Sequence, residues 1–264
     1  MKNRLLNAEE IREHLLVEFR QIPITVEQQV VSTNLTAKDQ AKLGALHGSV
    51  WLAESQTAGR GRLGRSFFSP AQQGIYFSVL LRRQKEEQPL LLLTTLAAVA
   101  VRRAIAAVCC IDTKIKWVND LYLNDRKLCG ILTEGVISPA GELSAAVLGI
   151  GLNFSGKQEE YPPELQNSIT ALYREAAPVS RNALTAAILN QLLLLASQPS
   201  LHIAALQEYR ENSWLLGEAI IWQENTIACK GTALDIDPSG GLIVEKENGE
   251  RTVLRSGEVT VRKQ

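Results

Sequence analysis

Apolar side chains recur with different periods along the first 214 residues. Recurrence every three or four positions predicts amphipathic helices, and these segments are residues 8–20, 33–46, 181–197 and 200–213. A long Leu- and Ala-rich segment over residues 89–108 predicts a buried helix. Alternating or β-branched segments predict strands, and these are residues 22–31, 49–55, 74–82, 113–118, 120–137 (with a turn at Asn124-Asp125) and 143–154. This order predicts an α+β fold, with helices packed on a mixed, largely antiparallel sheet.

The pattern changes after Trp214. From residue 217 to residue 263 short alternating segments are separated by turn sequences, Asp-Pro-Ser-Gly-Gly at 237–241 and Asn-Gly at 248–249. Turns of this kind join short antiparallel strands. We therefore predict two domains, one over residues 1–214 and a small β-barrel over residues 215–264.

Composition and charge exclude several classes of protein. The 264 residues include 28 Lys+Arg and 28 Asp+Glu, so the chain lacks the overall positive field typical of proteins that neutralise nucleic-acid phosphates. The apolar run at 89–101 is shorter than the roughly 20 residues of a membrane span, and the N-terminal segment is charged, unlike a signal peptide. These features predict a cytoplasmic protein that contacts no membrane. The four cysteines and three histidines have no metal-ligand spacing, so they predict no metal site.

A glycine- and arginine-rich segment, GRGRLGRS at 59–66, is the most distinctive part of the chain. It matches the G-x-G-x-x-G pattern and comes close to a P-loop, but both patterns require a helix to begin directly afterwards. Here two phenylalanines and a proline follow. A mobile cationic loop fits better, because glycine permits large backbone changes and arginine binds phosphate and carboxylate. Such a loop can close over an anionic ligand as a lid; an ordinary solvated loop and an RNA-binding segment are the alternatives.

A second segment with chemical potential is KIKWVNDLYLNDRKLCGIL at 114–132. Lys127 lies between apolar residues of a predicted strand, where lysine either protects a sheet edge or directs a charge into a cleft. Gly130 would let a ligand approach the backbone closely. Asn119-Asp120 by itself predicts a turn, so these residues alone leave the function open.

Five segments together resemble the biotin protein ligases. They are STN at 32–34, ESQTAGRGRLGRSFFSP at 54–70, KWVNDLYLNDRKLCGIL at 116–132, GIGLNF at 149–154 and SGEVTVR at 256–262. The resemblance implies a class II synthetase-like catalytic domain followed by an SH3-like barrel. It also implies an enzyme that uses ATP, with Mg²⁺, to join biotin to a lysine of a biotin carboxyl carrier protein through biotinoyl-5′-AMP.

The resemblance also implies roles for individual residues. Biotin would contact Ser32, Thr33, Asn34, Gln56, Gly59, Arg60, Gly61, Arg62, Lys127, Gly130 and Ile131. The nucleotide would contact Arg62, Arg65, Phe67, Asn119, Asp120 and Asn153, with Asp120 as a candidate Mg²⁺ ligand. Lys127, Arg62 and Arg60 would be catalytic, because cations must offset the charge of two anionic substrates. Glu258 or Arg262 of the barrel would assist ATP binding and acceptor docking.

Two positions depart from the family pattern, since Val118 replaces the usual proline and Phe67 a frequent tryptophan. Neither change removes a charged or hydrogen-bonding group. Some family members carry an N-terminal DNA-binding domain, whereas this chain reaches Ser32 after one predicted helix and one predicted strand. We therefore expect no operator DNA binding. The family often pairs sheet edges, so a homodimer is a further implication.

Other functions stay open on the sequence. A lipoate ligase would share the fold, but its typical RR-x-x-GGG segment is missing, and Gly-Gly occurs only at 240–241. A non-catalytic biotin sensor would not need Lys127, Asn119 and Asp120 together. An RNA-binding protein that uses the arginine loop would bind with steep salt dependence, and the net charge of zero argues against it.

Overall fold

The computed structural model describes residues 5–83, 89–224 and 227–261. Its main layer is a seven-stranded sheet in the order β1-β2-β3-β7-β6-β5-β4. The strands are β1 (Ile24–Val30), β2 (Val50–Gln56), β3 (Gly74–Arg82), β4 (Lys114–Lys116), β5 (Asp120–Leu123), β6 (Arg126–Ile137) and β7 (Leu143–Asn153). The pair β1–β2 is parallel and the other pairs are antiparallel. The predicted mixed α+β fold is thus confirmed.

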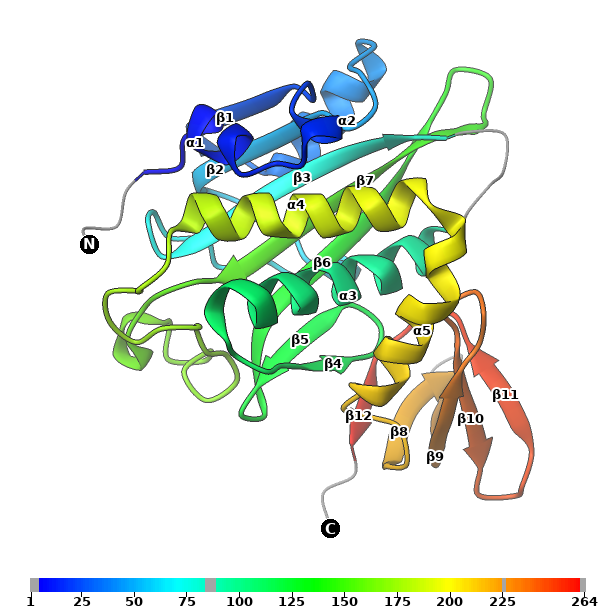
Figure 1. Cartoon of the computed structure of the whole chain (residues 1–264). Coiled ribbons are helices and arrows are strands. Elements are labelled where there is room, and N and C mark those ends of the chain that lie inside the picture. The colour runs from blue at the N-terminus through cyan, green and yellow to red at the C-terminus, as the bar shows by residue number, and fades with distance from the viewer. Residues whose placement is uncertain (1–4, 84–88, 225–226, 262–264) are drawn as a thin grey trace.

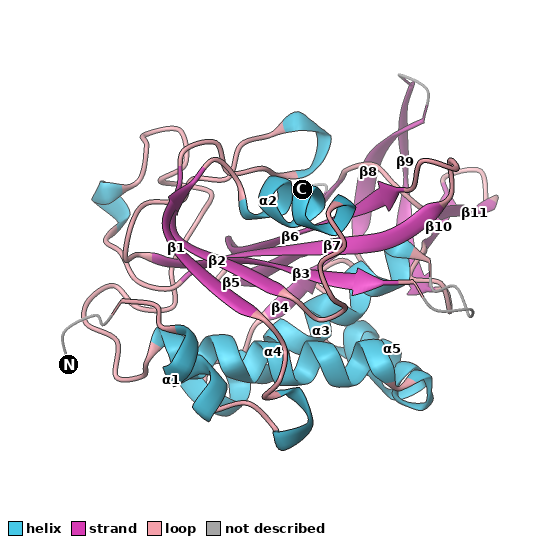
Figure 2. Ribbon diagram, turned by 90° about the horizontal axis from the view of Figure 1, so that it is seen from above, coloured by secondary structure: helices cyan, strands magenta, loops and turns pink. Residues whose placement is uncertain are grey.

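Helices cover both faces of this sheet (Figures 1 and 2). One face carries α1 (Ala8–Glu13), α3 (Leu90–Cys109), α4 (Arg181–Ser197) and α5 (His202–Glu211). The other face carries α2 (Thr33–Lys42), which packs its alanines against Trp51, Leu80 and Val147. The long helix α3 is the centre of the larger core, because it packs both against strand β6 of the sheet and against α4.

Helix α3 is long and apolar enough to cross a membrane, but 67% of its most apolar window is buried inside the protein. Its apolar surface is therefore satisfied by the core. Arg102 and Arg103, which end the apolar run, both form ion pairs with Glu208 of α5.

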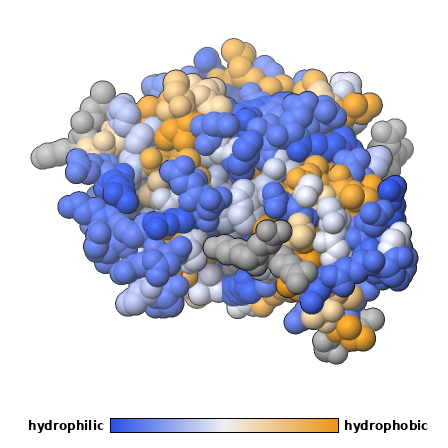
Figure 3. All heavy atoms as spheres, turned by 90° about the horizontal axis from the view of Figure 1, so that it is seen from below, coloured by the Kyte–Doolittle hydropathy of each residue, from blue (hydrophilic) through white to orange (hydrophobic). Residues whose placement is uncertain are grey.

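The face shown in Figure 3 is mostly hydrophilic, with apolar groups scattered over it.

The first helix is shorter than predicted, because α1 ends at Glu13 and a separate short turn follows at Val17–Phe19. Asn190 of α4 accepts a hydrogen bond from the Leu16 backbone and donates one to the His14 carbonyl. These tertiary contacts replace the backbone bonds that would continue the helix. Periodicity alone carries no information about such a partner.

The C-terminal part is a separate five-stranded antiparallel sheet in the order β11-β10-β9-β8-β12. Its strands are β8 (Ala219–Glu224), β9 (Ile227–Ile236), β10 (Leu242–Lys246), β11 (Arg251–Leu254) and β12 (Val259–Val261). The predicted turns are present, with Gly240 and Gly249 at φ of 86° and 83°, a region that favours glycine.

Three contacts join this sheet to the main domain. The Trp117 indole donates a hydrogen bond of 2.9 Å to the Gly240 carbonyl. A Cβ atom at Gly240 would lie 2.5 Å from Thr95 Oγ1, so the turn fits closely against α3. Arg210 of α5 contacts Asp235 Oδ1 at 2.7 Å. The C-terminal sheet is therefore held against Trp117, helix α3 and helix α5.

Candidate active site

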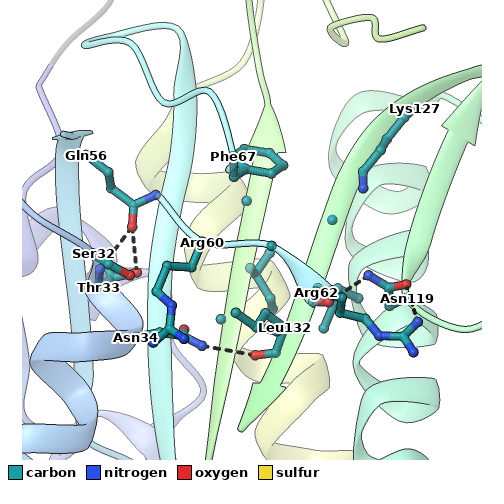
Figure 4. A pocket seen from close by; sticks show the side chains of 16 residues that line it. Ser32, Thr33, Asn34, Gln56, Arg60, Arg62, Phe67, Asn119, Lys127 and Leu132 are labelled. Carbon is teal, nitrogen blue, oxygen red and sulfur yellow. Dashed lines mark hydrogen bonds between the residues drawn. The ribbon is translucent and has the colours of Figure 1, made fainter. Parts of the chain in front are cut away.

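A narrow pocket, here named the inner pocket, lies where the N-terminus of α2, the end of β2 and strands β6 and β7 meet (Figure 4). It is lined by Ser32, Thr33, Asn34, Gln56, Arg60, Gly61, Arg62, Phe67, Asn119, Lys127, Gly130, Ile131, Leu132, Gly149, Ile150 and Gly151. Its volume of about 40 Å³ is far below the ~300–1,000 Å³ of typical small-molecule sites. A typical small-molecule ligand would therefore have to displace side chains at the mouth of the inner pocket.

A larger outer pocket, of about 440 Å³, adjoins the inner one. It is lined by Gly61, Arg62, Leu63, Arg65, Ser66, Phe67, Phe68, Lys116, Trp117, Asn119, Asp120, Tyr122, Lys127, Asn153, Leu165, Ser168, Ile169, Gly257, Glu258, Val259 and Thr260. Gly61, Arg62, Phe67, Asn119 and Lys127 line both pockets. The two pockets thus form one continuous site with these residues at its middle.

The structure brings nearly all the predicted site residues together. Every residue predicted to contact biotin lines the inner pocket except Gly59. A Cβ at Gly59 would collide with the Phe67 carbonyl, so this glycine lets the loop fold onto itself. Every residue predicted to contact the nucleotide lines the outer pocket, as does Glu258. Arg262 lies outside the described residues.

The first turn of α2 forms a buried polar wall of the inner pocket. Ser32, Thr33 and Asn34 are each less than 5% exposed. The Thr33 backbone N–H donates to Gln56 Oε1 at 2.9 Å, and the Asn34 amide nitrogen donates to the Leu132 carbonyl at 3.2 Å. Hydrogen bonds from two strands therefore fix this wall.

Two glycines of strand β7 line the inner pocket and allow close contacts there. A Cβ at Gly149 would collide with Asn34 Oδ1, and one at Gly151 would lie 2.6 Å from the Phe67 ring. The Phe67 ring also contacts the edge of Tyr76, with centroids 6.3 Å apart. The sequence prediction missed Gly149 and Gly151 as lining residues, although the GIGLNF motif contains both.

Three arginines of the glycine-rich loop reach three different partners. Arg60 pairs with Glu134 at 3.4 Å, Arg62 donates to Asn119 Oδ1 at 3.0 Å, and Arg65 donates to Glu258 Oε2 at 2.6 Å. The loop thus spans from the inner pocket to the C-terminal sheet. Burial lowers the pKa of Arg62, and the negative charges of Asp120 and Glu258 oppose that shift.

Glu134 is a further charged residue that the sequence prediction missed. It accepts hydrogen bonds of 3.0 Å from both Asn34 and Lys38. Burial opposes its ionisation, but these bonds and the charges of Lys38 and Arg60 outweigh burial, so its pKa is lowered. Glu134 lies about a hundred positions from its partners, so no local pattern points to it.

Lys127 lies at the boundary of the pockets and forms an ion pair of 2.8 Å with Asp120 Oδ1. The register of β5 and β6 is irregular between Leu121 and Tyr122, directly before the Tyr122–Lys127 pair. Lys127 is also anchored by its backbone, which bonds to Ser168 and Thr170 of the neighbouring loop. The backbone of Lys127 is therefore fixed, while its side chain can turn toward either pocket.

An aromatic cluster at the outer pocket was not predicted. The Lys116 ammonium lies 5.3 Å from the Tyr122 ring centre and 5.5 Å from that of Trp214. The two rings stack with centroids 5.2 Å apart. Burial lowers the pKa of Lys116 and raises that of Tyr122 to about 12.

The acidic side chains of the site decide whether it can hold the Mg²⁺ that the family resemblance implies. In the ranges 5–83, 89–224 and 227–261, no three His, Cys, Asp or Glu side chains gather as a metal site. Mg²⁺ in nucleotide sites usually takes one or two carboxylates together with substrate phosphates. Asp120 is a carboxylate that lines the outer pocket beside Lys127, so its chemistry fits that pattern.

The chain is similar to proteins of known family in both of its parts. Residues 26–153 match the Biotin/lipoate A/B protein ligase family, and residues 215–262 match the Biotin protein ligase C terminal domain. The Bifunctional ligase/repressor BirA of Bacillus subtilis is 31% identical, covering 94% of this chain and 77% of that protein. The Biotin--[acetyl-CoA-carboxylase] ligase of Mycobacterium tuberculosis is 30% identical, covering 91% of this chain and 89% of that protein.

A solved structure extends this similarity to three dimensions. The biotin protein ligase from Aquifex aeolicus in complex with biotin and ATP superimposes with a TM-score of 0.76 at 26% identity. The match covers 92% of this chain and 99% of that one.

Proposed function

The chain belongs to the biotin/lipoate A/B protein ligase family and is an ATP-dependent biotin ligase, and we propose that its inner pocket binds biotin and its outer pocket binds ATP. The observation that carries this assignment is that Arg62 and Lys127 line both pockets at their boundary. The carboxylate of biotin and the phosphates of ATP are both anionic, so they can meet only where cations offset their repulsion.

The proposed reaction takes place at the boundary of the two pockets, where the carboxylate of biotin and the phosphates of ATP come together. One carboxylate oxygen of biotin would attack the α-phosphorus of ATP, forming biotinoyl-AMP as the bond to pyrophosphate breaks. The amine of an acceptor lysine would then attack the biotinoyl carbonyl carbon, lose a proton and release AMP. Positioning and charge suffice for both steps, so no nucleophilic side chain of the ligase is needed.

Individual roles are proposed on the same basis. Lys127 would contact the biotin carboxylate in the first step and the phosphate of biotinoyl-AMP afterwards. Arg60 and Arg62, with Gly59 and Gly61 as flexible points, would close over the reactive anhydride and exclude water. Asp120 would hold Mg²⁺ together with phosphate oxygens, and the ion would supply further positive charge.

The remaining contacts are assigned to the two substrates. Ser32, Thr33, Asn34 and Gln56 would hold the ring system of biotin, and Gly130 and Ile131 would lie along its tail. Arg65, Phe67, Asn119 and Asn153 would contact the nucleotide. We further propose that residues 1–214 form the catalytic domain, and that Glu258 of the C-terminal domain, residues 215–264, assists the ATP site.

Partner and location complete the proposal. The acceptor would be the biotin carboxyl carrier domain of a carboxylase. Operator DNA is not an expected partner, because the chain has no net charge. The edge strand β1 offers a surface on which a homodimer could form. Four free thiols among the cysteines are in keeping with a cytoplasmic location.

Intact-mass measurement of a biotin carboxyl carrier domain tests the function directly. The domain is incubated with the ligase, MgATP and biotin, beside reactions with lipoate and reactions without ATP. We expect an ATP-dependent gain of one biotinyl group and no gain with lipoate. A gain with lipoate alone would identify a lipoate ligase, and tight biotin binding without any gain would identify a sensor.

A further inference from the structure

Ser78 lies directly behind the polar wall of the inner pocket, on strand β3. Its side chain is fully buried, and it does not line the pocket. Its Oγ lies 2.6 Å from Asn34 Oδ1 and 2.8 Å from Thr33 Oγ1. Ser78 thus contacts two wall residues at once, although a serine has only one hydroxyl proton.

The orientation of Asn34 decides where that proton goes. The Asn34 amide nitrogen faces two acceptors, the Leu132 carbonyl at 3.2 Å and Glu134 Oε2 at 3.0 Å. Glu134 is held in its ionised, acceptor-only form because its pKa is lowered. Asn34 Oδ1 therefore points to Ser78 and can only accept, so the Ser78 proton belongs to this 2.6 Å contact.

The remaining contact, between Thr33 Oγ1 and Ser78 Oγ, determines where the Thr33 hydroxyl proton points. Two hydroxyl oxygens 2.8 Å apart need a proton between them. Since Ser78 has already donated its own, Thr33 must supply this proton. Thr33 Oγ1 then turns only lone pairs toward the pocket.

Gln56 adds a second acceptor beside Thr33 (Figure 4). Its Oε1 faces the Thr33 backbone N–H at 2.9 Å, and its Nε2 donates to Ser69 Oγ at 2.8 Å, so the amide cannot be reversed. Thr33 Oγ1 also lies 3.3 Å from Gln56 Oε1 as a competing acceptor, but its contact with Ser78 Oγ is shorter, at 2.8 Å, and requires a proton between two hydroxyl oxygens. With the Thr33 proton directed to Ser78, two acceptors converge at this end of the pocket.

We propose that Ser78 is a positioning residue that makes this end of the pocket select ligands with N–H groups. The proposal rests on the proposed function, because the cyclic urea of biotin carries such groups. A site built to accept from N–H discriminates strongly against an analogue that lacks the donor, since its buried acceptors are left unpaired. Ser78 would thus set specificity without touching the ligand.

Paired calorimetric titrations test this role. Biotin is compared with both cyclic carbamates in which one ring N–H is replaced by oxygen, for the wild-type protein, Ser78→Ala and Ser49→Ala. Ser49 is another buried serine, 2% exposed, outside both pocket linings. We expect the wild type and Ser49→Ala to prefer biotin over the more weakly bound carbamate by about 100-fold or more.

In Ser78→Ala that preference should fall by about tenfold, because the released Thr33 hydroxyl can rotate and donate to the ring oxygen. A purely structural role would weaken both ligands equally and leave the ratio unchanged, which overturns the proposal. Ser78→Cys keeps a near-isosteric, weaker donor and should give an intermediate ratio. If Ser78→Ala does not fold, an unchanged ratio in Ser78→Cys is the contradicting result.

The two proposals fail in different ways. A wild-type protein that does not bind biotin contradicts the proposed function, and this inference with it. A wild-type protein that prefers biotin, with the same preference in both Ser78 variants, contradicts only the role of Ser78.

Discussion

The inner and outer pockets are built from different kinds of contact. The wall of the inner pocket consists of buried groups whose hydrogen bonds come from a helix and two strands. The outer pocket is closed by exposed charges on long side chains, such as Arg65 and Glu258 at 67% and 47% exposure. Exposed ion pairs contribute only ~0–1 kcal/mol each. The first arrangement suits a neutral ring that must fit closely, and the second suits a charged nucleotide that must enter and leave.

The largest expected effect is at the boundary of the two pockets. Lys127→Ala should lower the rate of biotinoyl-AMP formation by about 10²- to 10³-fold, because it removes one of the two cations that line both pockets. Biotin-dependent exchange of pyrophosphate into ATP measures this rate. Lys42→Ala, at an exposed lysine of α2, is the matched control. Normal exchange by a folded Lys127→Ala protein would remove Lys127 from catalysis.

Arg62→Ala should loosen the lid in addition to removing one of the cations at the pocket boundary. Arg62 connects the loop to Asn119 and to the Gly257 carbonyl of the C-terminal sheet. Its loss should raise the release of biotinoyl-AMP into solution roughly 10- to 100-fold. The measurement is the appearance of free adenylate without acceptor, with Arg251→Ala as the control at an exposed arginine. Unchanged leakage in the Arg62 variant would show that closure does not depend on it.

Gly149→Ala should act on the inner pocket alone. The added methyl group would collide with Asn34 Oδ1 and displace the polar wall. Biotin affinity should fall about tenfold, while the KM for ATP should change little. Calorimetry with biotin and initial rates at varied ATP separate the two effects. Equal losses for both substrates would contradict the division into two pockets.

Glu258→Gln should give the smallest effect and should act on the outer pocket. Removing the partner of Arg65 should raise the KM for ATP by about two- to fivefold at low salt. Added salt should reduce the difference from wild type, because it screens exposed charges. Glu245→Gln breaks a comparable exposed pair with Arg251 and should leave the KM unchanged. An effect on biotin affinity instead of on the KM for ATP would contradict the assignment of Glu258 to the ATP site.

The sequence was sufficient for the order of elements because local patterns determine them. Alternation and period identified the sheet strands, and Asn124-Asp125 marked the β5–β6 turn, where both residues have positive φ. The end of α1 was wrong because Asn190, far away in the chain, supplies the competing hydrogen bonds.

For the candidate site too, residues in contiguous motifs could be predicted and residues that act through a distant partner could not. Contiguous motifs gave the loop arginines, Lys127 and the first turn of α2. Ser78, Glu134 and Gly149 were missed because each matters through a partner on another element, Asn34. Similarly, nothing in the segment 59–66 indicates that Arg65 meets Glu258, since 193 positions separate the two.

The hydrogen bond from Trp117 to the Gly240 carbonyl limits how far the C-terminal sheet can be treated as an exchangeable module. A barrel grafted from a relative would reproduce this junction only if its turn keeps a glycine at the position of Gly240, where a side chain would press on Thr95. A mismatch there would reach the neighbouring residues Asn119 and Asp120 through Trp117. Chimeric ligases should therefore exchange the turn 237–241 together with the segment 114–120.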